Sequence, residues 1–276
     1  GVRPVPYLRW SEEQWSRQVR PPALIRPLWT PLTAAVPDNS MAFYGGSGGL
    51  AIYPFRGMSA MQVSATFWMS TDSLAKAGTF FSYVAGPVEE TFTIQESEME
   101  ARDLMVWIGG RGQRTGVVVA DGYWHHIAVT WSSYDGATFV YIDGMLMYST
   151  RMGKGLAIGD GGSLVLGQDQ RIESGWCCGF MPNRAYVGQL ADFKLWSVAL
   201  GLDEVRAQIH AKDSTKIRGL ILRFDFKPSK SSEQEVELWK HVIPDVSGLH
   251  HDAVRVGDPL PSLAQRDRGN LTTQVS

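Results

Sequence analysis

Three of the Asp-Gly pairs between residue 121 and residue 170 separate short apolar runs. They are Asp121-Gly122, Asp135-Gly136 and Asp143-Gly144. Asp-Gly readily adopts the positive φ angles that tight hairpin turns need, so the stretch is predicted to form an antiparallel β-meander. This pattern favours a β fold for the chain more strongly than any other feature.

The first run of the meander alternates between two sets of side chains. These are Ile127, Val129 and Trp131 on one side, and His126, Ala128 and Thr130 on the other. Successive side chains of a strand face opposite sides of a sheet, so one set is expected in a core between two sheets. We interpret these residues as core residues rather than as a binding site.

Composition limits the classes of partner. The chain has 276 residues, of which 44% are hydrophobic, so it can bury a sizeable core. Its net charge of −2 gives no basis for binding nucleic acid or an anionic membrane. Because no apolar run reaches the length of a bilayer span, we also predict no membrane-spanning segment.

The ends of the chain differ in composition from its middle. Residues 1–40 are rich in proline, arginine and tryptophan, and we predict an extended arm that packs on its own domain or on a neighbour. The β pattern then covers residues 41–257. Residues 258–276 form a polar tail, in which Asn270 begins an Asn-Leu-Thr glycosylation sequon.

Further patterns are predicted to form strands, one helix and a loop. The strands are expected at 50–53, 63–69, 79–84, 104–108, 117–119, 186–196 and 219–226. The helix is expected at 202–209, where two acids near its start suit the helix dipole. The acidic residues Glu96, Glu98 and Glu100 are interpreted as a solvated loop.

Several short sequence motifs between residues 41 and 209 occur in an order and spacing typical of one superfamily. They are Ala65-Thr66-Phe67-Trp68, Phe81-Ser82-Tyr83, Gly122 to Trp131, Tyr141 to Gly144, Gly162 to Gln170 and Gly188 to Trp196. The chain thereby resembles the pentraxin and laminin-G-like members of the concanavalin A-like group. The resemblance implies an all-β, two-sheet antiparallel jelly-roll sandwich with one short helix, and here extended terminal arms.

The same resemblance implies a calcium site. Its possible ligands are Glu89, Glu90, Asp169, Gln170 and Glu173. Calcium takes six to eight oxygen ligands, and Arg171 stands where the family's pattern has an acid. Two interpretations follow: a degenerate site that holds no metal, or a calcium site completed by Glu173.

The family's disulfide is absent. The resemblance places its two half-cystines at Ala65 and Ala128, so the sandwich is expected to depend on packing instead. The chain's two cysteines are Cys177 and Cys178, in the loop that would flank the calcium site. They are interpreted as a vicinal disulfide, as bridges to another chain, or as free buried thiols.

No catalytic constellation emerges from the residues. The sequence lacks the paired-carboxylate strand of the glycosidases that share this sandwich, and no Ser/His/Asp set can be assigned. Residues 220–226 and 245–254 also resemble the opening of a laminin-G-like repeat, which suits a segment of a multi-module protein.

The function predicted from these features is recognition outside the cell. We predict a non-catalytic recognition or assembly module, extracellular or on the cell surface, that contacts other protein modules or neighbouring subunits and needs no cofactor. The alternatives are a calcium-dependent carbohydrate-binding module and, third, a polysaccharide-active enzyme.

Overall fold

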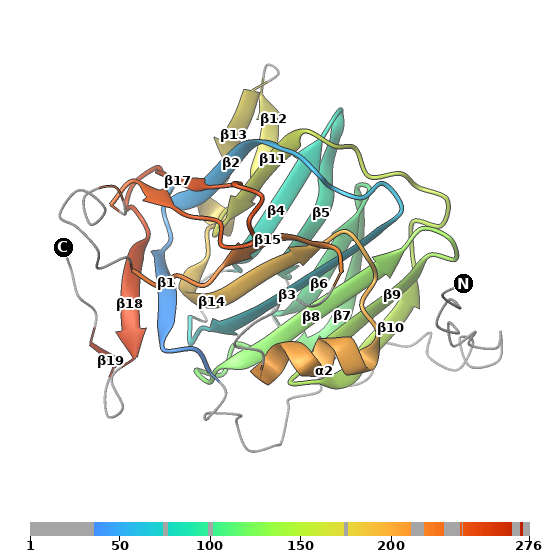
Figure 1. The fold of residues 1–276 in the computed structure, drawn as a ribbon, viewed down its shortest axis with the longest axis horizontal. Coiled ribbons are helices and arrows are strands. Elements are labelled where there is room, and N and C mark those ends of the chain that lie inside the picture. The colour runs from blue at the N-terminus through green and yellow to red at the C-terminus, as the bar shows by residue number, and fades with distance from the viewer. Residues whose placement is uncertain are drawn as a thin grey trace.

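Two large antiparallel sheets stacked face to face form the body of the molecule (Figure 1). The computed structural model describes residues 36–73, 77–98, 102–173, 176–210, 218–228, 238, 240–266 and 271–272. The predicted two-sheet sandwich is therefore confirmed. The arm predicted at residues 1–40 lies almost wholly outside the described residues, and so does Asn270.

The larger sheet has nine strands. In spatial order they are β10 (Met145–Arg151), β9 (Ala137–Ile142), β8 (His125–Ser132), β3 (Gln62–Ser70), β14 (Val187–Trp196), β1 (Asn39–Tyr44), β18 (Ser262–Arg266) and β19 (Leu271–Thr272), with β15 (Leu220–Phe224) also paired to β14. Two of these strands, β18 and β19, come from the segment that the sequence assigns to a polar tail. They extend the sheet beyond β1.

The second sheet has eight strands. They are β16 (Val242–Ile243), β17 (Ala253–Val256), β2 (Gly49–Phe55), β11 (Gly162–Leu166), β4 (Thr79–Ala85), β5 (Val88–Glu96), β6 (Asp103–Ile108) and β7 (Arg111–Val118). A separate hairpin of β12 (Gln170–Glu173) and β13 (Trp176–Phe180) lies against β4, β5 and β11.

Aromatic side chains fill the space between the two sheets. Phe67 of β3 stacks on Phe193 of β14 with ring centroids 5.9 Å apart, and Phe81 of β4 meets Phe193 edge-on at 5.3 Å. Trp131 of β8 is fully buried in the same core. Such large apolar rings at alternate positions explain why these segments form strands that bury one face.

The outer side of the nine-stranded sheet carries the one long helix of the described residues, α2 (Leu202–His210). Val205 of this helix packs with Ala128, Tyr141 and Trp196, which lie on three strands of the sheet. Trp68 is buried on the same side, near Ile209 of the helix. The helix therefore shields side chains that face away from the main core (Figure 1).

The register between β3 and β8 corrects one expectation. Ala65 lies opposite Val129 and points into the main core, whereas Thr66 lies opposite Ala128 beneath the helix. Ala65 and Ala128 are thus on opposite faces of the sheet, and the residues that face each other are Thr66 and Ala128. A shift of one residue moves a side chain to the other face, which is the source of the error.

Candidate functional site

Two of the five predicted calcium ligands, Glu90 and Asp169, both lie close to one guanidinium group, that of Arg184. Glu90 follows the tight turn between β4 and β5, with a φ of 48°. Asp169 comes directly after β11 and is 1% exposed. Glu89 is exposed beside them, and its charge acts on Glu90. The segment after β11 folds back over β4 and β5, where Ser82 of β4 donates to the carbonyl of Gln168 at 2.9 Å, and this brings Asp169 toward Glu90.

The centre of this acidic cluster is an arginine that the sequence analysis did not single out. Arg184 ends a short 3-10 helix, Pro182–Arg184. Its Nη1 lies 2.8 Å from Oδ2 of Asp169, and its Nε lies 2.6 Å from Oε1 of Glu98. Nη1 is also 3.8 Å from Oε1 of Glu90. One guanidinium thus contacts carboxylates from three segments of the chain.

Backbone hydrogen bonds hold Arg184 beside Asp169. The amide of Met181 donates to the carbonyl of Asp169 at 3.1 Å, and the amide of Arg184 donates to the carbonyl of Met181 at 2.8 Å. Next along the chain, the amide of Tyr186 donates to the carbonyl of Gly167 at 2.9 Å. The arginine is therefore positioned by the fold rather than by a flexible tether.

Charges in the cluster oppose one another. Burial raises the pKa of the Glu90 carboxyl, and the charges of Asp169 and Glu89 raise it further, while Arg184 and Arg171 lower it. Burial alone would lower the pKa of Arg184, but its hydrogen bonds to Asp169 and Glu98 outweigh that effect and raise it. The guanidinium thus opposes, but does not outweigh, the rise in the pKa of the Glu90 carboxyl.

Gln170 does not join the cluster, and the side chain of Glu173 lies outside the described residues. The Nε2 of Gln170 donates to the carbonyls of Ser82 and Ser163, both at 3.0 Å, so this side chain fastens β12 to the sheet. Glu173 lies opposite Trp176 in the β12–β13 hairpin. Cys177 and Cys178 lie in β13, and their side chains are outside the described residues.

The fit of this cluster to calcium is poor. Oδ2 of Asp169 accepts from Arg184, and Oδ1 accepts from the amide of Gln170 at 2.9 Å. Calcium needs six to eight free oxygens around one point, whereas a guanidinium offers only donors. Within the described ranges, no group of three or more His, Cys, Asp or Glu side chains has an arrangement that could hold a metal ion.

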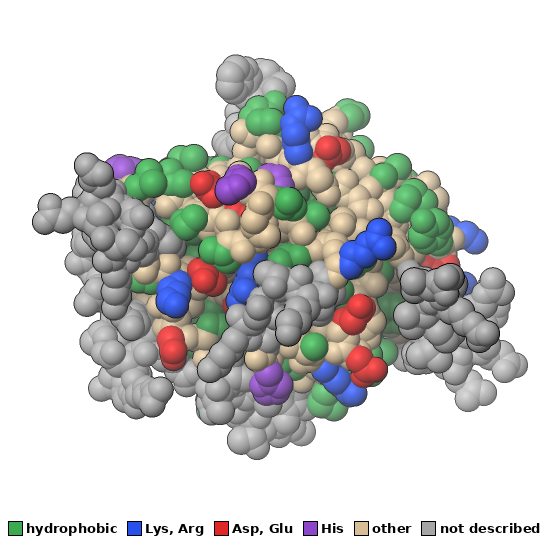
Figure 2. Space-filling model, viewed as in Figure 1, with side chains coloured by type: hydrophobic (Ala, Val, Ile, Leu, Met, Phe, Trp, Pro, Cys, Tyr) green, Lys and Arg blue, Asp and Glu red, His purple; other side chains and the backbone are tan. Residues whose placement is uncertain are grey.

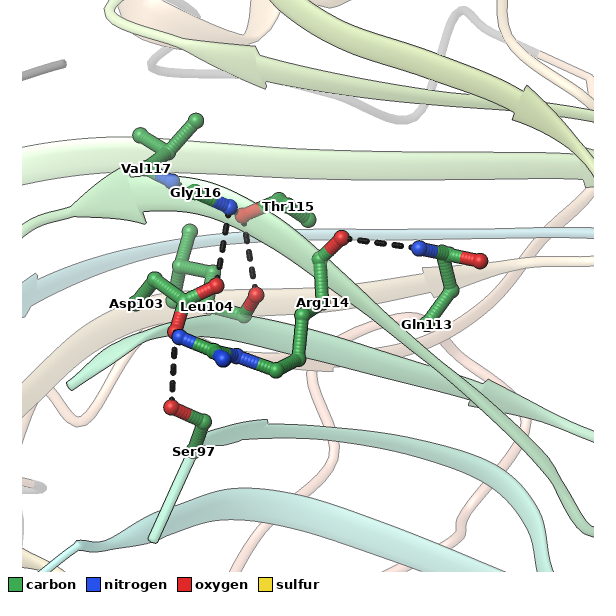
Figure 3. Close-up of polar contacts among 8 residues, drawn as sticks. All are labelled: Ser97, Asp103, Leu104, Gln113, Arg114, Thr115, Gly116 and Val117. Atoms are coloured by element: carbon green, nitrogen blue, oxygen red, sulfur yellow. Dashed lines mark hydrogen bonds and ion pairs between the residues drawn. The ribbon is translucent and has the colours of Figure 1, made fainter. Parts of the chain in front are cut away.

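A second set of interactions holds the loop that carries Glu98. Oδ1 of Asp103 accepts from Ser97 at 2.7 Å and from Nε and Nη2 of Arg114 at 2.9 and 2.6 Å, while Oδ2 accepts from the amide of Gly116 at 2.8 Å (Figure 3). Burial would raise the pKa of Asp103, but these hydrogen bonds and the Arg114 charge lower it. Asp103 therefore closes the base of the loop.

Glu96 contradicts the interpretation of its stretch as a solvated loop. It is 2% exposed at the end of β5, where Oε2 accepts from the amide of Gly78 at 3.0 Å. Burial raises its pKa to about 7, although the Gly78 amide and the charge of Arg102 act to lower it. Glu98 is half exposed and pairs with Arg184, and Glu100 lies outside the described residues.

The outer face of the eight-stranded sheet continues from this cluster. We use this term for the side that faces away from the main core, where Ser82, Thr93, Trp107 and Gly112 form one row across β4 to β7. Thr93 is buried and Trp107 is half-buried, and neither Thr93 Oγ1 nor Trp107 Nε1 has a hydrogen-bond partner among the described residues. The ring of Trp107 lies over Gly112, where a Cβ would touch it at 2.8 Å.

Sequence reasoning missed Arg184, Glu98, Thr93 and Trp107 as parts of this region. The alternation of Phe92 and Ile94 with Thr91, Thr93 and Gln95 marks a strand with one polar face, and it was the available signal for Thr93. Arg184 stands in a Met-Pro-Asn-Arg turn that carries no motif.

No helix in the described portion is both long enough and apolar enough to traverse a bilayer.

Comparison with solved structures supports the fold. The heptameric SAP-like pentraxin of Limulus polyphemus matches with a TM-score of 0.57 and 21% identity, over 67% of this chain and 88% of that chain. The extracellular region of zebrafish Gpr126/Adgrg6 matches with a TM-score of 0.53 and 14% identity, over 68% and 24%. At these identities the likeness concerns the fold alone.

Comparison with curated relatives at the level of sequence points to the same family. "Sushi, von Willebrand factor type A, EGF and pentraxin domain-containing protein 1" of Rattus norvegicus is 33% identical over 63% of this chain and 5% of its own length. Human neuronal pentraxin-1 is 36% identical over 50% and 31%. The chain thus spans less than half of each of these relatives. The model of the Pentaxin family matches residues 58–242, more than half of the chain, and the chain therefore belongs to the pentaxin family.

Proposed function

We propose that this chain is a non-catalytic recognition and assembly module of a larger extracellular protein, and that it contacts other protein modules through the outer face of the eight-stranded sheet. The observation that carries the proposal is the indole of Trp107, which lies half-buried on that face over Gly112. Aromatic side chains are enriched in protein–protein interfaces, so a partly exposed indole on a sheet face suits contact with a partner.

The acidic cluster around Arg184 supports the non-catalytic part of the proposal. A glycosidase needs one carboxyl group free to donate a proton and a second free to attack or to activate water. Here Asp169 and Glu98 are both bound by the Arg184 guanidinium, and Glu90 lies 3.8 Å from it. These acids therefore serve to position Arg184 and to shape the face.

Relatives and surface charge support the multi-module setting. One relative carries a pentraxin domain together with other domain types, and it is far longer than this chain. The chain's net charge is −2, and in Figure 2, which shows the side that carries α2, acidic and basic side chains are interspersed on the described part of the surface. A nucleic acid would call for clustered positive charge, so a protein partner is favoured.

Photo-crosslinking of the full-length protein tests the proposal. A photoreactive residue replaces Met105, which is half-buried on the outer face, and in a matched control it replaces Tyr134, which is 66% exposed. Protein adducts at position 105 that are absent at position 134, and that Trp107→Ala removes, support a protein-binding face. Equal adducts at both positions, or adducts that Trp107→Ala leaves intact, contradict it.

The second candidate is a lectin-like carbohydrate-binding module. Trp107 favours it, because a partly exposed indole ring suits the apolar face of a sugar. A bacterial protein proposed to bind carbohydrate, from Bacteroides ovatus, shares the fold with a TM-score of 0.61 and 17% identity, over 83% of this chain and 60% of that chain. A glycan array probed with wild type and Trp107→Ala, each in calcium and in EDTA, separates this candidate from the first.

A further inference from the structure

We infer that Arg184 acts as a built-in counter-ion that takes the place of a bound cation, so that this acidic cluster is closed to calcium. The inference concerns the cluster itself and holds for either kind of ligand on the outer face. Three carboxylates lie near one guanidinium: oxygens of Glu90, Glu98 and Asp169 are 3.8, 2.6 and 2.8 Å from nitrogens of Arg184.

The distances leave the buried carboxylate no free oxygen. Asp169 is 1% exposed, and its two oxygens accept from Arg184 Nη1 and from the amide of Gln170. A calcium ion would have to displace the guanidinium and then lie beside it, at a cost in like-charge repulsion. Arg184 is itself mostly buried, which makes its withdrawal into solvent costly.

Arginine is suited to this place in a way that lysine is not. Its planar guanidinium carries several donors at fixed angles, and Nε and Nη1 of Arg184 face two different carboxylates. The 3-10 turn at Pro182–Arg184 and the backbone hydrogen bonds of Met181 hold the side chain at the cluster. The arrangement is therefore complete without any ion from solution.

Calcium titration and thermal unfolding of three proteins test the inference. They are wild type, Arg184→Gln and the control Arg171→Gln, which removes an exposed charge that also acts on Glu90. Wild type and Arg171→Gln are expected to show no binding heat and the same melting temperature in EDTA and in millimolar calcium chloride. Arg184→Gln is expected to melt about 5 °C lower in EDTA, because Asp169 loses its counter-ion, and to regain stability in calcium.

Two results would overturn the inference. The first is calcium heat in the wild type that Asp169→Asn abolishes, a measurement that does not depend on whether Arg184→Gln folds. The second is an Arg184→Gln protein that responds to calcium no more than wild type does. The double variant Asp169→Asn, Arg184→Gln removes both charges, and it is expected to melt above Arg184→Gln in EDTA and to ignore calcium.

Discussion

Asp103 and Arg114 form a two-pronged ion pair: Nε and Nη2 of the arginine lie 2.9 and 2.6 Å from the same carboxylate oxygen of Asp103. The pair joins β6 to β7 where their register shifts, between Asp103 and Met105. Since Asp103 also accepts from Ser97, it ties the loop after β5 to the same point (Figure 3). This loop carries Glu98 to Arg184, so the ion pair supports the candidate site from a distance.

We expect Asp103→Asn to lower the free energy of unfolding by about 2 kcal/mol, because a buried carboxylate that holds a guanidinium is replaced by a neutral amide. Urea unfolding at pH 7 measures the change. The control is Arg111→Gln, which alters an exposed residue of β7, the strand that also carries Arg114. It should change the free energy of unfolding by less than about 0.5 kcal/mol. Equal effects of the two substitutions would contradict the role given to Asp103.

Glu96 makes stability depend on pH near neutrality. Its folded pKa of about 7 lies above the ordinary value of 4.5, so the folded state binds the proton more tightly. The associated stability is fully present below about pH 4.5 and is lost as pH rises through 7. We expect Glu96→Gln to flatten this decline and, at pH 8, to raise the free energy of unfolding by up to about 3 kcal/mol. Unfolding curves from pH 5 to 8 would refute the prediction if both proteins declined in parallel.

His125 gives a second, separable pH effect. Burial lowers its pKa, but the hydrogen bond to Asp143 at 2.8 Å and the charges of Asp143 and Asp121 raise it above 6.5 overall. The protonated form therefore stabilises the fold below pH 6.5, and this contribution is lost as pH rises through the folded pKa.

We expect His125→Gln to cost about 2 kcal/mol at pH 5.5 and less at pH 8.5, since the charge-assisted hydrogen bonds exist only in the protonated form. Denaturant titrations at the two pH values measure the difference. Glu96→Gln, whose effect grows with pH instead, serves as the comparison. A loss that is the same at both pH values would show that His125 acts through packing alone.

Gly162 opens β11 where the strand passes close to β4. A Cβ at this position would collide with the carbonyl oxygen of Val84 and lie 2.9 Å from the ring of Tyr83. Because the carbonyl belongs to the sheet backbone, it cannot move aside, and we expect Gly162→Ala to cost about 2–3 kcal/mol in thermal or chemical unfolding. Gly201→Ala, where the nearest atom would be Glu204 Oε2 at 3.7 Å, should cost less than about 1 kcal/mol. If Gly162→Ala left the free energy of unfolding unchanged, β11 would be shown to shift and make room for the added Cβ.

The alternation of apolar and polar residues, together with the turn residues, was enough to predict most of the strands. Alternation placed Ile127, Val129 and Trp131 in the core, and the Asp143-Gly144 turn lies between β9 and β10 as expected. The strand β5 escaped notice because its outer face carries Thr91, Thr93 and Gln95, which made it look like a polar loop. The alternation of Phe92 and Ile94 with these polar residues was the signal for the strand, and it went unused because the polar residues were not expected to be buried.

What the sequence alone determined about this protein is its fold class. The alternation of apolar and polar residues, the hairpin turns and the order of the family's motifs specify a two-layer β-sandwich, because they depend only on residues that are near one another along the chain. Tertiary structure alone decided which distant residues meet. It placed Thr66 rather than Ala65 opposite Ala128, buried Glu96, and brought Arg184 to Asp169. Register and loop packing depend on contacts between segments far apart in sequence, and a one-residue shift or a single turn changes them without altering any local pattern.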